Sequence, residues 1–147
     1  MAATIDMRGE RDYRADPATV FDFVVDPLND PIWCPAVDGC QQITGDGPAP
    51  GAVYRWDQIV GEGDHFPMDV TLDVVDRPNR IEWSVDNDMM GYRSEMTFEP
   101  LPNGGTRVTQ HNHTTVKVAP DEMSSQLQEQ AVGVMNQQFD NLEKALD

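Results

Sequence analysis

The chain is poor in cysteine, in lysine and in long apolar runs. It has 2 cysteines, Cys34 and Cys40, whereas a small secreted scaffold held by disulfides usually has more. No stretch approaches the ~20 apolar residues of a helix that crosses a bilayer. The first residues, MAATIDMRGERDYR, lack the apolar core of a signal peptide. These absences predict a reduced, cytoplasmic protein that does not insert into membranes.

Positive charge is also scarce, with 10 Lys and Arg against 26 Asp and Glu and a formal net charge of −16. Nucleic acids and anionic membranes attract basic surfaces, so neither is an expected partner. Of the cations only Lys117 and Lys144 are lysines. Two interpretations remain open: an acidic protein from a source rich in Arg codons, or adaptation to high salt, which screens self-repulsion.

Alternation of apolar and polar residues is the main structural signal. A length of 147 residues predicts a single domain over residues 1–147. In the fourth predicted strand Met68, Val70, Leu72 and Val74 share one face, and Gly9 in the first marks a bulge or a bend. Short turns between the strands predict one antiparallel sheet. The predicted strands cover residues 4–14, 37–44, 52–60, 68–74, 81–85, 92–99 and 106–118.

Two helical segments accompany the strands. Asp16 before Pro17 is a typical helix start, and a short helix is expected over residues 17–25. A long helix over about residues 120–146 is amphipathic, with an apolar arc of about half its circumference. This helix is the only long element available to cover the sheet. The arc consists of Met123, Leu127, Ala131, Val132, Val134, Met135, Phe139, Leu142, Ala145 and Leu146.

Three stretches resemble one known superfamily: "ADPATVFDFVVDPLNDPIWCPAV", "GGTRVT" and the closing "FDNLEKALD". They are similar to the START-like superfamily, also called Bet v 1-like, SRPBCC or polyketide cyclase/dehydrase-like. The resemblance covers nearly the whole chain. It implies an α+β helix-grip fold, in which a curved antiparallel sheet of about seven strands wraps around the long C-terminal helix. It also implies two short helices after the first strand and a hydrophobic cavity between helix and sheet.

The segment DPLNDPIWCP, residues 26–35, is not expected to form a long helix or strand, because its three prolines interrupt both. By the resemblance it holds the second short helix and the turn into the second strand. Ile32 and Trp33 are then expected to seal one end of the cavity. Trp33 has two interpretations, a core plug or a residue that lines the cavity.

Polar residues on predicted inward faces indicate a binding site. In the last strand the valines at both ends, Val108 and Val118, mark the even positions as inward, yet mid-strand even positions are polar. Gln138 breaks the apolar arc of the long helix. A few polar groups in an apolar cavity are typical of a small-molecule site, although buried amides also pair with each other or with water. The candidate ligand-binding residues are Trp33, Tyr54, Trp56, Gln58, Trp83, Tyr92, Ser94, Met96, Gln110, Asn112, Thr114, Leu127, Met135 and Gln138, and Tyr13 and Arg11 share inward faces.

Catalytic and metal signatures are weak. His111 and His113 share one strand face and His65 adds a third histidine, but the predicted phase turns the pair to solvent, so no metal and no cofactor are expected. Cys34 has no histidine near it in sequence and is expected to be a buried structural thiol. No catalytic set is identified.

The function expected from these features is binding or carrying of a small hydrophobic or aromatic molecule. Two alternatives remain open, a polyketide cyclase/dehydratase-like enzyme and a protein-interaction module. A cavity with polar groups that stabilise enolates and move protons would be enough for the enzyme. The ligand and the oligomeric state are not readable from the sequence.

Overall fold

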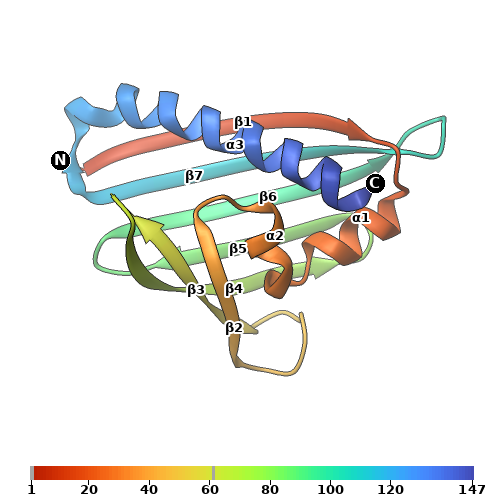
Figure 1. Ribbon diagram of the computed structural model, residues 1–147, viewed down its shortest axis with the longest axis horizontal. Helices are drawn as coiled ribbons and strands as arrows, with labels where there is room; N and C mark the ends of the chain where they lie inside the picture. The colour runs from red at the N-terminus through yellow and green to blue at the C-terminus, as the bar shows by residue number, and fades with distance from the viewer. Residues whose placement is uncertain (1, 61) are drawn as a thin grey trace.

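A curved antiparallel sheet wraps around the C-terminal helix α3 (Figure 1). The structure is a computed structural model and describes residues 2–60 and 62–147. Its 7 strands lie in the order β1-β7-β6-β5-β4-β3-β2, so the first strand pairs with the last. The helix-grip architecture predicted above is confirmed. The elements are β1 (Ala2–Tyr13), α1 (Pro17–Val24), η1 (Pro27–Asn29), α2 (Asp30–Trp33), β2 (Val37–Thr44), β3 (Val53–Val60), β4 (Asp64–Asp76), β5 (Arg80–Asp86), β6 (Met90–Pro100), β7 (Thr106–Pro120), η2 (Asp121–Met123) and α3 (Ser124–Leu146).

The predicted strands all form, but the phase of β4 changes within the strand. Its pairing with β5 shifts register between Leu72 and Val74, where the chain holds one extra residue. Beyond this bulge Val75 pairs with Ile81 and packs against the core, in the place expected for Val74. Strict alternation therefore predicted the wrong residue after the bulge. At the end of β7 Val118 is 65% exposed, so it does not continue the inward row that Val108 begins.

Gly9 allows α3 to approach β1 closely. Of the two features expected at Gly9, a bulge or a bend, the bulge is absent, because the register of β1 against β7 is continuous there and shifts at Ala2 and Ala3 instead. A Cβ at Gly9 would lie 2.5 Å from Met135 Sδ and 2.8 Å from Phe139 Cε2. The glycine is therefore needed because the helix crosses the strand at that point.

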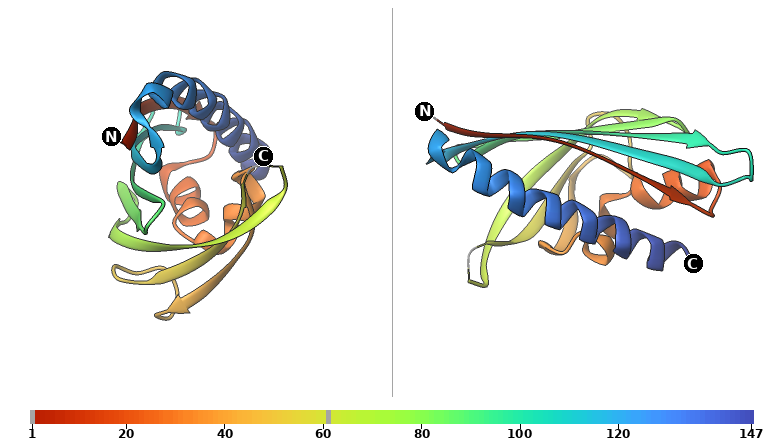
Figure 2. Two further views of the ribbon diagram at one scale, coloured as in Figure 1. Left: turned by 90° about the vertical axis from the view of Figure 1, so that its left-hand side faces the viewer. Right: turned by 90° about the horizontal axis from the view of Figure 1, so that it is seen from above.

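Helix α3 lies along β1 and also contacts α2, while the short helices cover other parts of the inner face, α1 against β6 and α2 with η1 against β2 (Figure 2). Only Met135, Phe139 and Leu142 are fully buried, and Leu127, Ala131 and Leu146 pack partly against the core. Met123, Val132 and Val134 are exposed, so the predicted arc of ten buried residues is too wide. A helix that touches one strand and one short helix buries a narrow stripe.

Near the end of α3 the inner face of the sheet is filled by buried side chains, and we call this part the closed end. It consists of Tyr13, Phe21, Phe98, Phe139 and Leu142. The rings of Phe21 in α1 and Phe98 in β6 meet edge to face at 5.5 Å. The Tyr13 hydroxyl donates to the carbonyl of Phe139 at 3.0 Å. Helix α1 begins as predicted, with the Asp16 carboxylate accepting from the Thr19 amide at 2.9 Å.

Arg11 lies beneath the C-terminal part of α3 and outside the cavity. Its guanidinium pairs with Asp140 and lies 5.4 Å from the centre of the Phe139 ring. It therefore fastens α3 to β1. No helix among the described residues is long and apolar enough to cross a membrane.

Candidate functional site

A cavity of about 280 Å³ lies between α3 and the inner face of the sheet. Residues from all seven strands, α2 and α3 line it, so it depends on the whole helix grip. Its surface is mainly apolar, with Met7, Met68 and Met135 among the lining side chains. Methionine side chains adapt their shape readily, which suits a surface that accommodates ligands.

All 3 tryptophans of the chain line this cavity together with one carboxyl group. Trp33 comes from α2, Trp56 from β3 and Trp83 from β5. Asp30 begins α2, is 6% exposed and accepts a hydrogen bond at 2.8 Å from the indole Nε1 of Trp56. Asp30 and Trp33 are three residues apart in the single turn of α2, and this spacing places both side chains on its inward face.

The position of Asp30 follows from the corner that precedes it. Asp26 caps η1 by accepting from the Leu28 amide at 3.1 Å, and the Asn29 side chain donates to the carbonyl of Phe23 at 2.9 Å. On the other side, Asn141 of α3 donates to the carbonyl of Trp33 at 3.2 Å. The proline-rich corner is thereby held between α1 and α3, with Asp30 turned inward.

Burial raises the pKa of Asp30 to about 8. The Trp56 and Trp33 side chains oppose this shift by favouring the ionised form, and the charge of Asp26 adds to it. Trp33 Nε1 lies near Asp30 but is buried without a hydrogen-bond partner. The carboxyl group is therefore mostly protonated at neutral pH in the empty cavity.

A polar network on β6 and β7 forms one wall. The Ser94 hydroxyl donates to Asn112 Oδ1 at 2.5 Å and accepts from Gln110 Nε2 at 3.3 Å. Gln110 is 2% exposed, and its Oε1 has no partner. Gln58 Oε1, from β3, is also buried without a partner. Unpaired buried polar atoms cost free energy, so the wall offers hydrogen-bonding capacity that the protein alone does not use.

Most of the residues singled out from the sequence line the cavity, although their role in binding stays a prediction. They include Asn112 on the sheet and Gln138 on α3, which do not hydrogen-bond to each other. Predicted residues that line it are Trp33, Trp56, Gln58, Trp83, Tyr92, Gln110, Asn112, Thr114, Met135 and Gln138.

Four predicted residues lie outside the lining. Tyr54 and Met96 are buried in the core and do not line the cavity. Ser94 lies behind the wall and acts through Gln110 and Asn112. Leu127 packs on the core near the start of α3, beyond the cavity.

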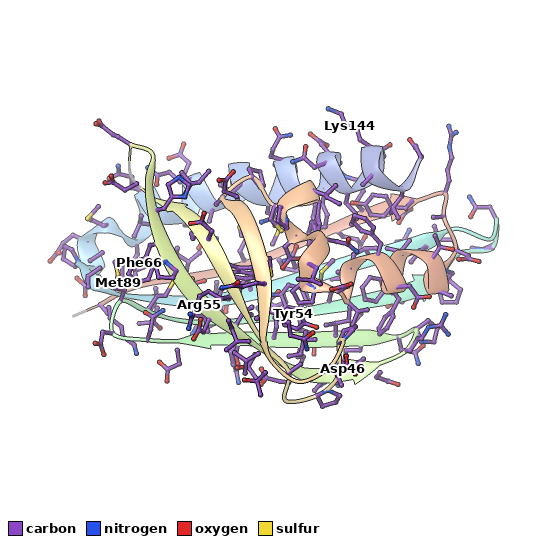
Figure 3. The ribbon with its side chains drawn as sticks, turned by 60° about the horizontal axis from the view of Figure 1, so that its bottom comes forward. Asp46, Tyr54, Arg55, Phe66, Met89 and Lys144 are labelled. Carbon is purple, nitrogen blue, oxygen red and sulfur yellow. The ribbon has the colours of Figure 1, made fainter. Side chains whose placement is uncertain are left out.

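In Figure 3, Phe66 and Met89 lie towards the end of the molecule where α3 begins, and Tyr54 lies away from them. Met89 and Val134 are exposed apolar residues, at 39% and 42%. Since Val134 also lines the cavity, the cavity reaches the surface beside α3.

Ile32 corrects the expectation for DPLNDPIWCP. Trp33 is 2% exposed and lines the cavity, whereas Ile32 is 57% exposed. Neighbouring residues of a helical turn point about 100° apart, so the one-turn α2 places only one of the two inward. Of the two residues, only Trp33 lines the cavity.

The lining residues that sequence reasoning missed are Asp30 and a set of small or apolar side chains. An aspartate before proline is a common helix start, so nothing in the sequence placed Asp30 in the cavity. Alternation had placed Met68 on one face of the fourth predicted strand without assigning it to the cavity, and Met7 of the first strand was not singled out. The others are Ile5, Cys34, Ala36, Val37, Met90, Ala131 and Val134.

The histidines do not form one site. His111 and His113 of β7 pair with Asp6 of β1, at 2.7 Å and 3.5 Å. His65 of β4 pairs with Asp57 of β3 at 2.9 Å, with Asp38 nearby, and three strands separate β7 from β3. The cluster of Asp38, Asp57 and His65 lies on the outer surface and faces away from the cavity.

Cys34 lines the cavity but lacks the features of a reactive thiol. Burial raises its pKa, and burial raises the pKa of Cys40 to about 12. Both cysteines are free. A thiol that does not ionise near neutral pH is a weak nucleophile.

Comparison with known proteins gives one family and several similar folds. The family model described as polyketide cyclase / dehydrase and lipid transport matches residues 4–147. Similar solved structures include the protein of unknown function SA2116 from Staphylococcus aureus (TM-score 0.80, 11% identity, covering 99% of this chain and 94% of that one). Others are CV1439 from Chromobacterium violaceum (0.72, 16%, 96% and 96%) and Ara h 8.0201 (0.68, 18%, 98% and 98%). No curated protein matches the sequence.

Proposed function

Because the chain belongs to the polyketide cyclase/dehydrase and lipid transport family, we propose that it binds a small, mainly apolar or aromatic molecule in the cavity beneath α3. The observation that carries the proposal is the cavity itself. It offers about 280 Å³ and combines an apolar lining with buried polar atoms that have no partner within the protein. A small number of polar groups in an apolar pocket fixes the orientation of a ligand.

Native mass spectrometry of the purified protein, followed by titration with lipids, flavonoids and polyketide-like aromatics, tests this proposal. Tryptophan fluorescence is a direct readout because all 3 tryptophans line the cavity. Ala131→Phe places a ring at a lining position of α3 and is expected to abolish the fluorescence response. Gln130→Phe adds the same ring at the exposed neighbouring position and is expected to leave it unchanged.

Two results would contradict the proposal. One is a ligand response that survives in Ala131→Phe, which would place binding elsewhere. The other is the absence of any bound mass, thermal shift or fluorescence change across the whole screen, which would favour a protein-interaction module.

A second candidate function is a cyclase or dehydratase acting on a carbonyl-rich aromatic precursor. The observation that favours it is Asp30, a carboxyl group in an apolar cavity with a pKa raised to about 8 by burial. Such a group exchanges protons near neutral pH, as acid–base catalysis requires. Asp30→Asn is expected to retain binding and lose turnover if the protein is an enzyme, and turnover by the variant would remove Asp30 from that role.

A further inference from the structure

Within the described part of the chain, two of the three fully buried atoms that line the cavity and lack a hydrogen-bond partner are acceptors. Gln58 Oε1 and Gln110 Oε1 are buried acceptors without donors, and among the residues that the structure describes no Lys, Arg or His lines the cavity to neutralise the carboxyl group of Asp30. The one lining donor found buried without a partner, Trp33 Nε1, lies beside that same carboxyl group. A ligand group that satisfies the two acceptors and the carboxyl group of Asp30 brings donors or positive charge.

The aromatic residues favour positive charge in the same place. Trp56 Nε1 already donates to Asp30, which fixes one indole against the carboxyl group. Asp30, Trp56 and Trp83 also meet in a second, smaller hollow next to the main cavity. Tryptophan rings attract cations more strongly than other aromatic rings, and the attraction grows where water is excluded.

The charge of the whole chain acts in the same direction. At a net charge of −16 the protein attracts cations and repels anions. An anionic ligand would meet both this field and Asp30, without a lining cation to hold it.

We propose that the cavity takes a ligand with a cationic nitrogen, a quaternary ammonium or a protonated amine, which lies against Asp30 among the three tryptophans. The apolar body of the ligand fills the space between the methionines of β1, β4 and α3. This inference rests on the proposed binding function and names the chemical class of its ligand.

Binding of such a cation is coupled to loss of a proton. In the empty cavity Asp30 holds a proton at neutral pH, and a cation at the same place favours the ionised carboxylate. Below pH 8 the cation must therefore displace the proton, and its affinity rises with pH until Asp30 is ionised.

The other charged and titratable groups around Asp30 do not produce this dependence. Asp26 faces it from the η1 corner, Cys34 from just after α2 and Cys40 from β2. Tyr54 and Tyr92 face it from β3 and β6. Burial raises the pKa of both cysteines and both tyrosines, so these four stay neutral between pH 6 and pH 9. From α3 the polar side chain that lines the cavity is Gln138, which does not titrate.

The test compares two probes of nearly identical shape, benzyltrimethylammonium and its neutral carbon isostere neopentylbenzene, by tryptophan fluorescence. At pH 9 the ammonium is expected to bind at least about tenfold more tightly than the isostere. Its affinity is expected to fall at least about tenfold between pH 9 and pH 6, while that of the isostere stays constant.

Variants assign the effect to Asp30. Asp30→Asn is expected to remove both the preference for the ammonium and its pH dependence. Asp26→Asn removes a neighbouring charge outside the lining while retaining an acceptor for the Leu28 amide, and it is expected to retain both properties. If Asp30→Asn does not fold, the carboxyl ¹³C shift of Asp30 in the wild-type protein gives the same information, because its pKa is expected to fall when benzyltrimethylammonium saturates the cavity.

Equal binding of the two probes at pH 9, or an Asp30 pKa that the ammonium leaves unchanged, would overturn the inference. If neutral aromatics from the screen still bind in either case, the proposed function stands and only the ligand class is wrong. If no compound of any charge changes the tryptophan fluorescence, the proposed function fails together with the inference.

Discussion

The two halves of the inner face are built from the same sheet and the same helix, but they differ in packing and in the pairing of their polar groups. At the closed end aromatic rings pack edge to face, and the polar groups are paired: Tyr13 donates to Phe139, and the Thr106 hydroxyl donates to the carbonyl of Ala15 at 2.8 Å. At the cavity end space remains, and Gln58, Gln110 and Trp33 keep unpaired atoms. We therefore expect substitutions at the closed end to affect mainly stability and those at the cavity end to affect mainly the proposed binding.

The largest expected effect comes from a truncation at the closed end. Phe21→Ala should lower the free energy of unfolding by about 3–5 kcal/mol, because Phe21 is buried against Phe98 and its removal leaves a cavity. Met90→Ala, at a half-buried residue that already borders empty space, should cost less than about 2 kcal/mol. Chemical denaturation of both variants measures the difference, and equal losses would contradict the division into two halves.

Much of this division was predictable from local pattern, and part of it was not. Alternation in β7 placed Gln110 and Asn112 inward, because a strand repeats every two residues whatever packs on it. Helical periodicity predicted which side of α3 faces the core. It did not predict the width of the buried stripe, because that width depends on where β1 and α2 lie. The close approach at Gly9 and the bulge in β4 are also tertiary, and neither leaves a mark in local hydrophobicity.

Asp30 shows the limit of sequence reasoning most clearly. Its neighbours in sequence, Asn29 and Pro31, indicate an exposed corner, and the chain has 26 acidic residues. Its burial depends on partners far away in sequence, since Trp56 lies in β3 and Asn141, which holds α2, lies in α3. No spacing rule connects these residues.

The pH dependence of stability gives the second largest expected effect. The pKa of Asp30 is raised to about 8 in the folded protein, so the folded state binds a proton that the unfolded state has lost above about pH 4. The stability that this proton contributes is present at low pH and is lost as the pH rises to about 8. Relative to Asp30→Asn, the wild-type protein should lose about 2–4 kcal/mol between pH 5 and pH 8. Parallel pH profiles for the two proteins would show that Asp30 is ionised in the fold.

A smaller effect is expected where α3 crosses β1. Gly9→Ala should cost about 1–3 kcal/mol, because its Cβ would overlap Met135 and Phe139 unless the helix moves. Gly133→Ala is the matched control on α3: it meets no atom within 4 Å and should stabilise the protein by about 0.5–1 kcal/mol. Thermal unfolding of the pair measures the two signs, and a neutral Gly9→Ala would mean that α3 is loosely held on the sheet.

The smallest expected change in stability is at Gln138, where a substitution is expected to affect ligand affinity rather than folding. Asn112, the polar residue opposite, already accepts from Ser94, so Gln138→Leu leaves that group paired. The free energy of unfolding should therefore change by less than about 0.5 kcal/mol, whereas affinity for a cavity ligand should fall several-fold. Thr106→Val at the closed end is the contrast: it strands the carbonyl of Ala15 and should cost about 1–3 kcal/mol with no change in affinity. A destabilised Gln138→Leu with unchanged affinity would make this amide part of the scaffold, and the polar wall would then end at the sheet.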